Sequence, residues 1–271
     1  MDASLIAFVG GGNMASALIG GLRRGGHAAA RIVVVEPFEA QRERLAQAFD
    51  VAAQASADAR LAAADMVVWA VKPQSFGDAA APCAPFVADA LQVSVMAGIR
   101  IDRIAAALGV QTHAARIVRA MPNTPALVGR GIAALYAAGA VAAHERTAVE
   151  ALFAPTGSTL WVEREADLDA VTALSASGPA YVFYFIEAMV QAGTEMGLTA
   201  EQSRRLAQET FAGAAALAMQ SSDPPERLRE RVTSKGGTTH AAICSLEGDG
   251  VKAAFVRALH AARTRAEELG R

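Results

Sequence analysis

Two kinds of hydrophobic pattern follow one another from Ser4 to about residue 162. Short runs of β-branched and other apolar residues are bounded by turn residues, and alanine-rich segments with helical spacing separate them. This alternation is typical of βαβ units, whose strands lie parallel in one sheet. The pattern therefore predicts a mainly parallel sheet with strands over residues 5–9, 32–35, 66–71, 93–96, 117–118 and 159–162.

The second part of the chain shows long helical periodicities and no strand candidate. Ser177-Gly178-Pro179 predicts a helix start and Gly197 its end, because serine, proline and glycine favour those positions. Thr199 and Gln202 have the spacing of a capping box, which predicts a further helix. We therefore expect an α/β domain over residues 1–164 and an all-helical domain over residues 165–271, in which residues 221–225 break a helix, residues 233–238 form a glycine loop and residues 251–269 form the last helix.

Composition and charge indicate a globular protein without a broad nucleic-acid surface. The 271 residues are 53% hydrophobic and 19% charged, with a formal net charge of −2. That is enough apolar material for a buried core and too little positive charge for a nucleic-acid partner. The helical part is so rich in apolar residues that it can bury only some of them by itself, so we expect a homodimer through these helices.

The cysteines, the histidines and the N-terminus predict no metal site, disulfide framework or targeting segment. Cys83 and Cys244 lie far apart, and none of the five histidines has ligand spacing with another. We therefore expect no metal and a reduced, cytoplasmic setting. The start lacks the basic region of a signal peptide, and the uncharged runs 131–143 and 171–186 are too short for a membrane helix, so no membrane partner is expected.

A glycine-rich turn, Val9-Gly10-Gly11-Gly12-Asn13-Met14-Ala15, joins the first predicted strand to a helix. Its G-x-G-x-x-A spacing puts Gly10, Gly12 and Ala15 at the positions of a dinucleotide-binding fingerprint. Glycine allows the tight turn and lets a pyrophosphate approach the helix N-terminus, whose free N–H groups favour an anion. The sequence therefore predicts a Rossmann-type domain that binds a nicotinamide dinucleotide.

Glu36 ends the second predicted strand, about 20 residues beyond the fingerprint. An acidic side chain there accepts a hydrogen bond from the ribose 2′-hydroxyl of NAD and repels a 2′-phosphate. The alternative is an exposed glutamate, with Arg42 and Arg44 close enough to bind the phosphate instead. Both cofactors therefore stay open, and Glu36 favours NADH.

Three further segments follow predicted strands, at the edge where open α/β sheets bind ligands. Ala70-Val71-Lys72-Pro73-Gln74 leaves Lys72 at the rim, where a solvated lysine is the alternative. Met96-Ala97-Gly98 offers small residues against which a nicotinamide ring fits. Met121-Pro122-Asn123-Thr124-Pro125 predicts a rigid polar loop, for which an ordinary turn is the alternative.

The segment Val232-Thr233-Ser234-Lys235-Gly236-Gly237-Thr238-Thr239 lies between two predicted helices. Glycines, threonines and a serine before a helix expose amides and hydroxyls, which is typical of an N-terminal site for a carboxylate. A neutral hydroxyl there could also donate a hydrogen bond to a ring nitrogen. A plain capping loop is the alternative, since Ser and Thr are the usual caps. His240 follows directly, but it lacks the orienting partner that a catalytic histidine needs.

Together these segments resemble the pyrroline-5-carboxylate reductase family, over nearly the whole chain and in the same order. The resemblance implies a Rossmann domain, a helical dimerisation domain, and hydride transfer from NAD(P)H to the cyclic imine 1-pyrroline-5-carboxylate. The product is L-proline, in the last step of its biosynthesis. A homodimer with a site shared between subunits is also implied, as is further assembly into decamers. The matching segments are VGGGNMA (9–15), AVKPQ (70–74), MAGI (96–99), RAMPNTPALVG (119–129), TALSASGPAYVF (172–183) and VTSKGGTTHAAICSLE (232–247).

The resemblance also implies roles for individual residues. Thr239 takes the position of the threonine that hydrogen-bonds the imine nitrogen, and it is the expected catalytic residue. The implied substrate contacts are Glu165, Ser234, Gly236, Gly237, Thr238 and Thr239. The implied cofactor contacts are Val9, Gly10, Gly11, Gly12, Asn13, Met14, Glu36, Ala70, Val71, Lys72, Pro73, Val95, Met96 and Ala97.

Three positions depart from the family's pattern. Ala176 stands where glycine is common, and Lys235 stands where proline often precedes the glycine pair. Glu36 stands where many members carry Ser or Asn, which bears on the choice of cofactor.

Two other functions share some of these features. A related two-domain hydroxyacid dehydrogenase resembles families that place a catalytic lysine in the first long helix of the second domain, and residues 181–196 contain no lysine. A nucleotide sensor without enzymatic activity would keep the glycine-rich turn but would leave the loop 232–239 unexplained.

Overall fold

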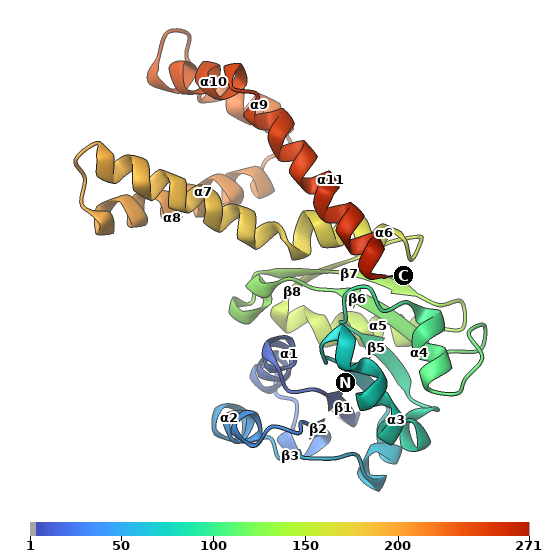
Figure 1. Ribbon diagram of the computed structural model, residues 1–271. Helices are drawn as coiled ribbons and strands as arrows, with labels where there is room; N and C mark the ends of the chain where they lie inside the picture. Colours follow the sequence, from blue (N-terminus) through green and yellow to red (C-terminus); the bar gives the residue numbers. More distant parts are fainter. Residues whose placement is uncertain (1–3, 271) are drawn as a thin grey trace. The chain divides into compact units, whose positions relative to one another are not determined.

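The computed structural model describes residues 4–270, which form two compact units. The sheet unit contains the chain up to Ala176 and again from Ala262, and the helical unit is Ser177–Ala261 (Figure 1). These units are defined by packing within one chain. The functional division that we expect after residue 164 is a different boundary, and it stays a prediction.

The sheet unit is built on an eight-stranded sheet in the order β3-β2-β1-β4-β5-β6-β7-β8 (Figure 1). Neighbouring strands are parallel except β6 and β7, which are antiparallel. The predicted α/β architecture with a mainly parallel sheet is therefore confirmed. The strands are β1 (Ile6–Val9), β2 (Ile32–Val35), β3 (Ala53–Gln54), β4 (Met66–Trp69), β5 (Leu91–Ser94), β6 (Ile117–Met121), β7 (Gly131–Ala137) and β8 (Gly157–Trp161).

Two strands were not predicted from the sequence pattern. β7 has the sequence GIAALYA, and its alanines and buried faces give neither the β-branched composition nor the alternation of a typical strand. Its ladders with β6 and β8 impose the extended conformation. β3 has only two residues and pairs with the end of β2. The strand predicted over residues 66–71 ends at Trp69, because the chain then leaves the sheet toward Pro73.

Helices cover both faces of the sheet. Residues Ala15, Leu18, Ile19 and Leu22 of α1 recur at helical spacing and pack in a core cluster with side chains from one face. Helices α2 and α5 also contribute to that cluster, whereas α3 and α4 pack against the other face. These helices are α1 (Asn13–Arg24), α2 (Glu39–Phe49), α3 (Phe76–Val87), α4 (Ile101–Ala107) and α5 (Ala143–Phe153), and α6 (Asp167–Val171) follows β8.

The strand order places a topological switch point beside β1. The chain goes from β1 to β2 on one side and returns to β4 on the other side. In open α/β sheets the crevice at the carboxyl ends of the two strands flanking this point is the usual place for a dinucleotide. The carboxyl ends of β1 and β4 are followed directly by two of the predicted cofactor segments, at Gly10 and Ala70.

The helical unit has the helices that the sequence predicted. α7 (Gly178–Glu195) begins after Ser177, and Gly197 follows its end with φ +97°. The capping box of α8 (Ala200–Gln220) is present, since the Gln202 N–H donates to Thr199 Oγ1 at 3.1 Å and the Thr199 N–H donates to Gln202 Oε1 at 2.9 Å. The remaining helices are α9 (Pro225–Arg231), α10 (Thr238–Gly248) and α11 (Val251–Leu269), of which the last belongs to this unit up to Ala261.

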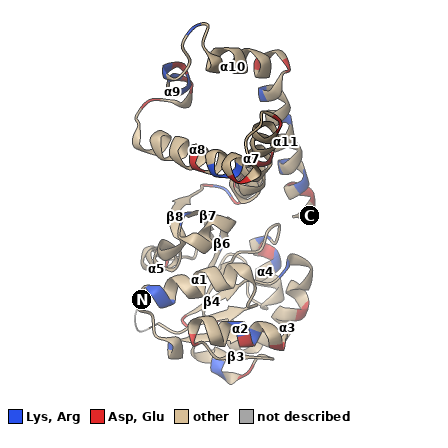
Figure 2. Ribbon diagram, turned by 90° about the vertical axis from the view of Figure 1, so that its left-hand side faces the viewer, with Lys and Arg blue, Asp and Glu red and all other residues tan. Residues whose placement is uncertain are grey.

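Helix α7 carries few charged residues, which Figure 2 marks in blue and red on a tan ribbon. Its only acidic or basic residues are Glu187 and Glu195, and Phe183 and Tyr184 are both about two-thirds exposed. By length and composition alone, the helical run Asp167–Glu195 could cross a membrane, although only 6% of its apolar window is buried in this chain. A surface this apolar is normally covered, either by lipid or by another protein chain.

The two cysteines lie in different surroundings. Cys83 is fully buried in α3, and burial raises the pKa of its thiol to about 11, so the thiol is neutral near pH 7. Cys244 is exposed on α10, with its Sγ 3.8 Å from His240 Nε2. Within residues 4–270 no group of three or more His, Cys, Asp or Glu side chains is arranged to hold a metal ion.

Candidate active site

The glycine-rich turn lies at the switch point of the sheet. The Gly10 N–H donates to the Val35 carbonyl at 2.8 Å, which fixes the turn against the end of β2. Gly10 has φ +95°, and a Cβ at this position would lie only 2.7 Å from the Ala70 carbonyl oxygen. Only glycine fits both the left-handed backbone and the close approach to Ala70. The turn after β1 is thereby held against the turn after β4.

Gly12 lies where the turn enters α1, next to open space. It is the N-cap of α1, and a Cβ built on it would have no heavy atom within 4 Å. Space is therefore left in front of the first helical amides, which have no partner within an α-helix. Open space at a helix N-terminus, next to a turn fixed by Gly10, fits the pyrophosphate of NAD(P)H.

Glu36 is buried rather than exposed, with 6% of its surface accessible. Its Oε2 accepts the Gly11 N–H at 2.8 Å, and its Oε1 accepts the Phe38 N–H at 3.0 Å. The guanidinium of Arg42 donates to the backbone carbonyls of Glu36 and Pro37, at 3.0 and 2.7 Å. The carboxylate is therefore held in one orientation by backbone amides. Each of its oxygens keeps a second lone pair for a ribose hydroxyl.

The other predicted cofactor segments lie at the same edge of the sheet. The Ala70 N–H donates to the Val9 carbonyl at 2.8 Å, and the Val95 N–H donates to the Trp69 carbonyl at 3.1 Å. Val9 and Met96 are buried in the core, so only their backbone groups are available to a ligand. Lys72, Pro73 and Asn13 are exposed, whereas Met14, Ala70, Val71, Val95 and Ala97 are partly exposed. The structure thus gathers all the predicted cofactor residues in the sheet unit.

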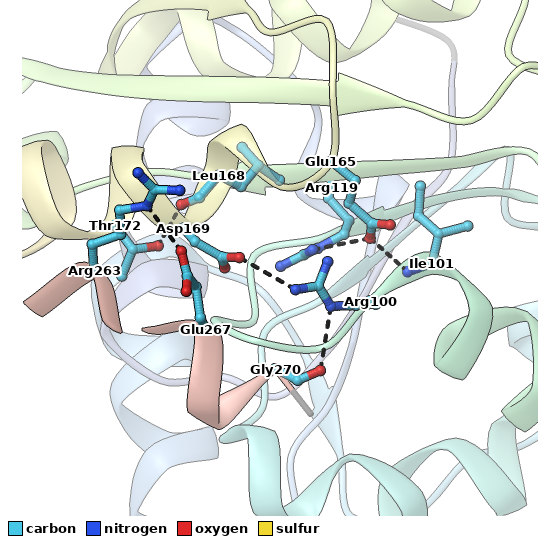
Figure 3. A network of polar contacts seen from close by, with 10 residues as sticks. All are labelled: Arg100, Ile101, Arg119, Glu165, Leu168, Asp169, Thr172, Arg263, Glu267 and Gly270. Atoms are coloured by element: carbon cyan, nitrogen blue, oxygen red, sulfur yellow. Dashed lines mark hydrogen bonds and ion pairs between the residues drawn. The ribbon is translucent and has the colours of Figure 1, made fainter. Parts of the chain in front are cut away.

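Glu165, an implied substrate residue, belongs to a polar network in the sheet unit (Figure 3). Its Oε1 accepts the Ile101 N–H at 2.8 Å and Arg119 Nη1 at 2.9 Å. In the same network, Arg100 contacts Asp169 Oδ2 at 3.3 Å and donates to the Gly270 carbonyl at 3.3 Å. Sequence reasoning missed Arg119 as a site residue, although an arginine within the apolar strand β6 was a usable signal.

The proline-bracketed loop after β6 is more than an ordinary turn. Asn123 Oδ1 accepts the Ile132 N–H at 3.0 Å, and Asn123 Nδ2 donates to Ser175 Oγ at 3.2 Å. Ser175 belongs to a π-helical turn, Thr172–Ala176. Single π-helical turns are frequent at functional sites. Asn123 therefore connects two of the segments that carry the resemblance.

The remaining implied substrate residues lie in the helical unit. Gly236 has φ +77°, and the Gly237 N–H donates to the Ser234 carbonyl at 3.0 Å, which turns the chain into α10. Gly237 is the N-cap, so Thr238 and Thr239 are the first two residues of the helix. Both threonines are exposed, and their N–H groups are free to bind a carboxylate.

Comparison with known proteins identifies the family that combines such a glycine-rich turn with such a helical unit. Residues 165–269 match the family model of pyrroline-5-carboxylate reductase dimerisation, and residues 5–98 match that of NADP oxidoreductase, coenzyme F420-dependent. The pyrroline-5-carboxylate reductase of Pseudomonas aeruginosa is 43% identical over 270 residues, covering 99% of this chain and 98% of that protein. The chain belongs to the pyrroline-5-carboxylate reductase family.

Solved structures agree with this assignment. A pyrroline-5-carboxylate reductase from Coxiella burnetii has a TM-score of 0.89 and 36% identity, and the match covers 99% of both chains. The Plasmodium falciparum pyrroline carboxylate reductase with NADP bound also has a TM-score of 0.89, at 28% identity and full coverage of both chains. The predicted function is confirmed: as a reductase of this family, the protein is an NAD(P)H-dependent oxidoreductase that reduces pyrroline-5-carboxylate to proline.

The dimerisation match bears on the apolar surface of α7. The matched residues 165–269 include the whole of α7. The dimerisation match thus includes the helix that carries the apolar surface, and the protein is a homo-oligomer. The run Asp167–Glu195 gains its membrane-like composition from the same apolar residues.

Proposed function

We propose that this reductase uses NADH in preference to NADPH, and that Glu36 sets the preference. The supporting observation is the fixed Glu36 carboxylate, which is buried and bonded to the amides of Gly11 and Phe38. A 2′-phosphate beside this carboxylate would meet a like charge that cannot turn away. Arg42, the nearest candidate for binding a phosphate, is bonded to backbone carbonyls instead.

We further propose that the residues of this chain act mainly by orientation. The bound cofactor supplies the hydride, and the protein aligns the imine carbon with it. The free amides at the start of α10, with Ser234, Gly236, Gly237 and Thr238, hold the substrate carboxylate. Thr239 Oγ1 donates a hydrogen bond to the lone pair of the ring nitrogen while the imine is neutral. A cyclic imine is basic enough to be protonated easily, so positioning and electrostatics suffice without a histidine or lysine acid.

The first test is the oxidation of NADH and of NADPH by the wild-type protein, with pyrroline-5-carboxylate as substrate. We expect turnover with both cofactors and a higher kcat/KM with NADH. Turnover with neither cofactor, despite measured cofactor binding, would overturn the assigned reaction and favour a different imine or a hydroxyacid on the same scaffold.

The Glu36→Gln variant tests the cofactor preference directly. Glutamine removes the charge and keeps one oxygen, which can still accept the Gly11 N–H, whereas its NH2 group replaces the oxygen that accepts the Phe38 N–H. We expect the ratio of kcat/KM for NADPH to that for NADH to rise about tenfold, since loss of one unfavourable charge contact is worth about 1.4 kcal/mol. The matched control is Glu39→Gln, which removes a carboxylate from the exposed side of α2. Gln54→Glu is unsuitable as a control, because it adds a charge near the same edge of the sheet. An unchanged ratio in Glu36→Gln would remove Glu36 as the determinant.

We also propose a cytoplasmic homodimer through the helical unit, with decamers as a further assembly and no membrane or nucleic-acid partner. In this dimer the 232–239 loop of one subunit faces the cofactor of its partner. The proposal rests on the dimerisation match and on the exposed apolar residues of α7.

Mixing two inactive variants tests the shared site. Gly12→Val damages the cofactor side and Thr239→Ala damages the loop, so each mixed dimer regains one intact site if the loop acts across the interface. A 1:1 mixture after subunit exchange is then expected to recover about a quarter of wild-type activity, as random pairing into symmetric dimers predicts. Light scattering confirms that the mixture is oligomeric. No recovery from an exchanged mixture contradicts the shared site, and binding to lipid vesicles contradicts the absence of a membrane partner.

A further inference from the structure

We propose that Arg119 is a positioning residue, which holds one oxygen of Glu165 so that the other faces the positively charged ring nitrogen of the substrate. The inference rests on the proposed function, in which Glu165 contacts pyrroline-5-carboxylate. Arg119 itself touches neither substrate nor cofactor in this proposal. It acts through the Glu165 carboxylate.

The sheet fixes where the Arg119 side chain points. Arg119 lies in β6, paired with Ser94 of β5 on one side and with Tyr136 of β7 on the other. Side chains alternate along a strand, and Ile117, two residues earlier, packs in the core on the face covered by α3 and α4. Arg119 therefore points to the side of the sheet where α4 begins. Its partner in register, Ser94, directly precedes the predicted cofactor segment at Val95.

Arg119 is almost completely buried, and not all of its donors have a partner in the described part of the chain. Only 2% of its side chain is exposed, and its Nε is buried without a hydrogen-bond partner among the described residues. Its Nη1 donates to Glu165 Oε1 at 2.9 Å. Buried ion pairs are weak contributors to stability, and an apolar residue would fit a central strand better. The burial is explained if the protein needs the Glu165 carboxylate at this place.

Among the described residues, only one of the two carboxylate oxygens of Glu165 is hydrogen-bonded. Oε1 accepts both Arg119 Nη1 and the Ile101 N–H, and within residues 4–270 Oε2 makes no hydrogen bond. The Glu165 side chain is 22% exposed, so this carboxylate still reaches solvent, while its partner arginine is buried. An ionised carboxylate only accepts hydrogen bonds, so its free oxygen suits an N–H donor or a cation.

The charges of the substrate decide which of its groups Glu165 can face. Pyrroline-5-carboxylate carries a carboxylate and a ring nitrogen that is positive when protonated. Glu165 repels the carboxylate, which leaves the ring nitrogen, and the product amine likewise presents N–H groups. Leu168, buried in a small cluster with Met121 and Ala134, anchors the start of α6 next to Glu165. Arg119 and this cluster together keep the carboxylate from turning away.

The test compares Arg119→Met and Arg119→Lys with Arg116→Met as a matched control. Arg116 immediately precedes the same strand, and its ion pair is with Glu145, so its loss does not touch Glu165. For Arg119→Met we expect the KM for pyrroline-5-carboxylate to rise at least tenfold, with the KM for NADH within twofold of wild type. Arg119→Lys keeps a positive charge next to Glu165 and should recover part of the loss. Arg116→Met should change neither KM.

Two further measurements separate a positioning role from a structural one. If Arg119 acts through Glu165, adding Arg119→Met to Glu165→Gln should raise the substrate KM no further. The affinity for L-proline should fall in Arg119→Met, whereas that for tetrahydrofuran-2-carboxylate, whose ring oxygen has no N–H, should stay within twofold.

An equal rise of both KM values, additive effects in the double variant, or an unchanged substrate KM overturns the proposal. If wild-type protein does not turn over pyrroline-5-carboxylate, the proposed function fails instead. The loss of affinity for L-proline in Arg119→Met then still tests the contact between Glu165 and the ring nitrogen. Thermal melting of each variant identifies any that fails to fold.

Discussion

Replacement of Thr239 by alanine is expected to lower kcat about 100-fold, while NADH binding is retained. Loss of one well-placed hydrogen-bond donor at a reacting centre typically lowers kcat by about 10²–10³-fold, or at least about 2.7 kcal/mol. Thr239 is the second residue of α10, and its hydroxyl makes no hydrogen bond within residues 4–270, so the fold loses no contact. The hydroxyl is then free to serve a ligand. NADH affinity, measured by fluorescence titration, should stay within twofold of wild type.

Two companion variants make the Thr239 result specific. Thr239→Ser keeps the hydroxyl and should restore most of the turnover. Thr147→Ala removes an exposed threonine on α5, whose Oγ1 donates to the Ala143 carbonyl at 3.2 Å, and it should leave turnover unchanged. If Thr239→Ala turns over at the wild-type rate, the hydroxyl does not serve the imine nitrogen and the assigned role is wrong.

Replacement of Gly12 by valine is expected to weaken NADH binding more than 100-fold without unfolding the protein. Gly12 has φ −67° and ψ −167°, which any residue adopts, and its missing Cβ faces open space. Valine is therefore accommodated by the protein alone, but it fills the space in front of the α1 amides where the pyrophosphate would bind. Loss of that contact, at about 1.4 kcal/mol per tenfold change, amounts to at least about 2.7 kcal/mol of binding free energy.

Two further variants, Gly139→Val and Gly10→Ala, are compared with Gly12→Val. Gly139 is exposed and also has no atom near its missing Cβ, but it follows the end of β7, which is antiparallel to β6 and so ends at the opposite edge of the sheet. That variant should bind NADH normally. Gly10→Ala should lower the melting temperature as well as binding, because its Cβ meets Ala70 and its φ is positive. Normal NADH affinity in Gly12→Val would exclude the turn as the pyrophosphate site.

Much of the fold was predictable because its signals are local. The fingerprint at Gly10 and Gly12, the capping box at Thr199, and the last helix over residues 251–269 all depend on residues close together in the chain, and the structure has them in place. Strand β7 was missed because its alanine-rich sequence has no strand preference of its own. Its conformation comes from β6 and β8, which pair with it from both sides.

The candidate site likewise has some features that the local sequence determines and others that only the tertiary structure determines. The sequence by itself determined the dinucleotide turn, the acidic residue at the end of β2 and the threonine-rich start of α10, since glycine and capping chemistry act over a few residues. Only the tertiary structure decided that Glu36 is buried on two amides, and that Arg119 meets Glu165 across 46 residues of chain. Burial and ion pairing depend on strand register and on the packing of distant segments. Register and packing are set by the whole sheet, so the sequence around Glu36 or Arg119 alone does not predict them.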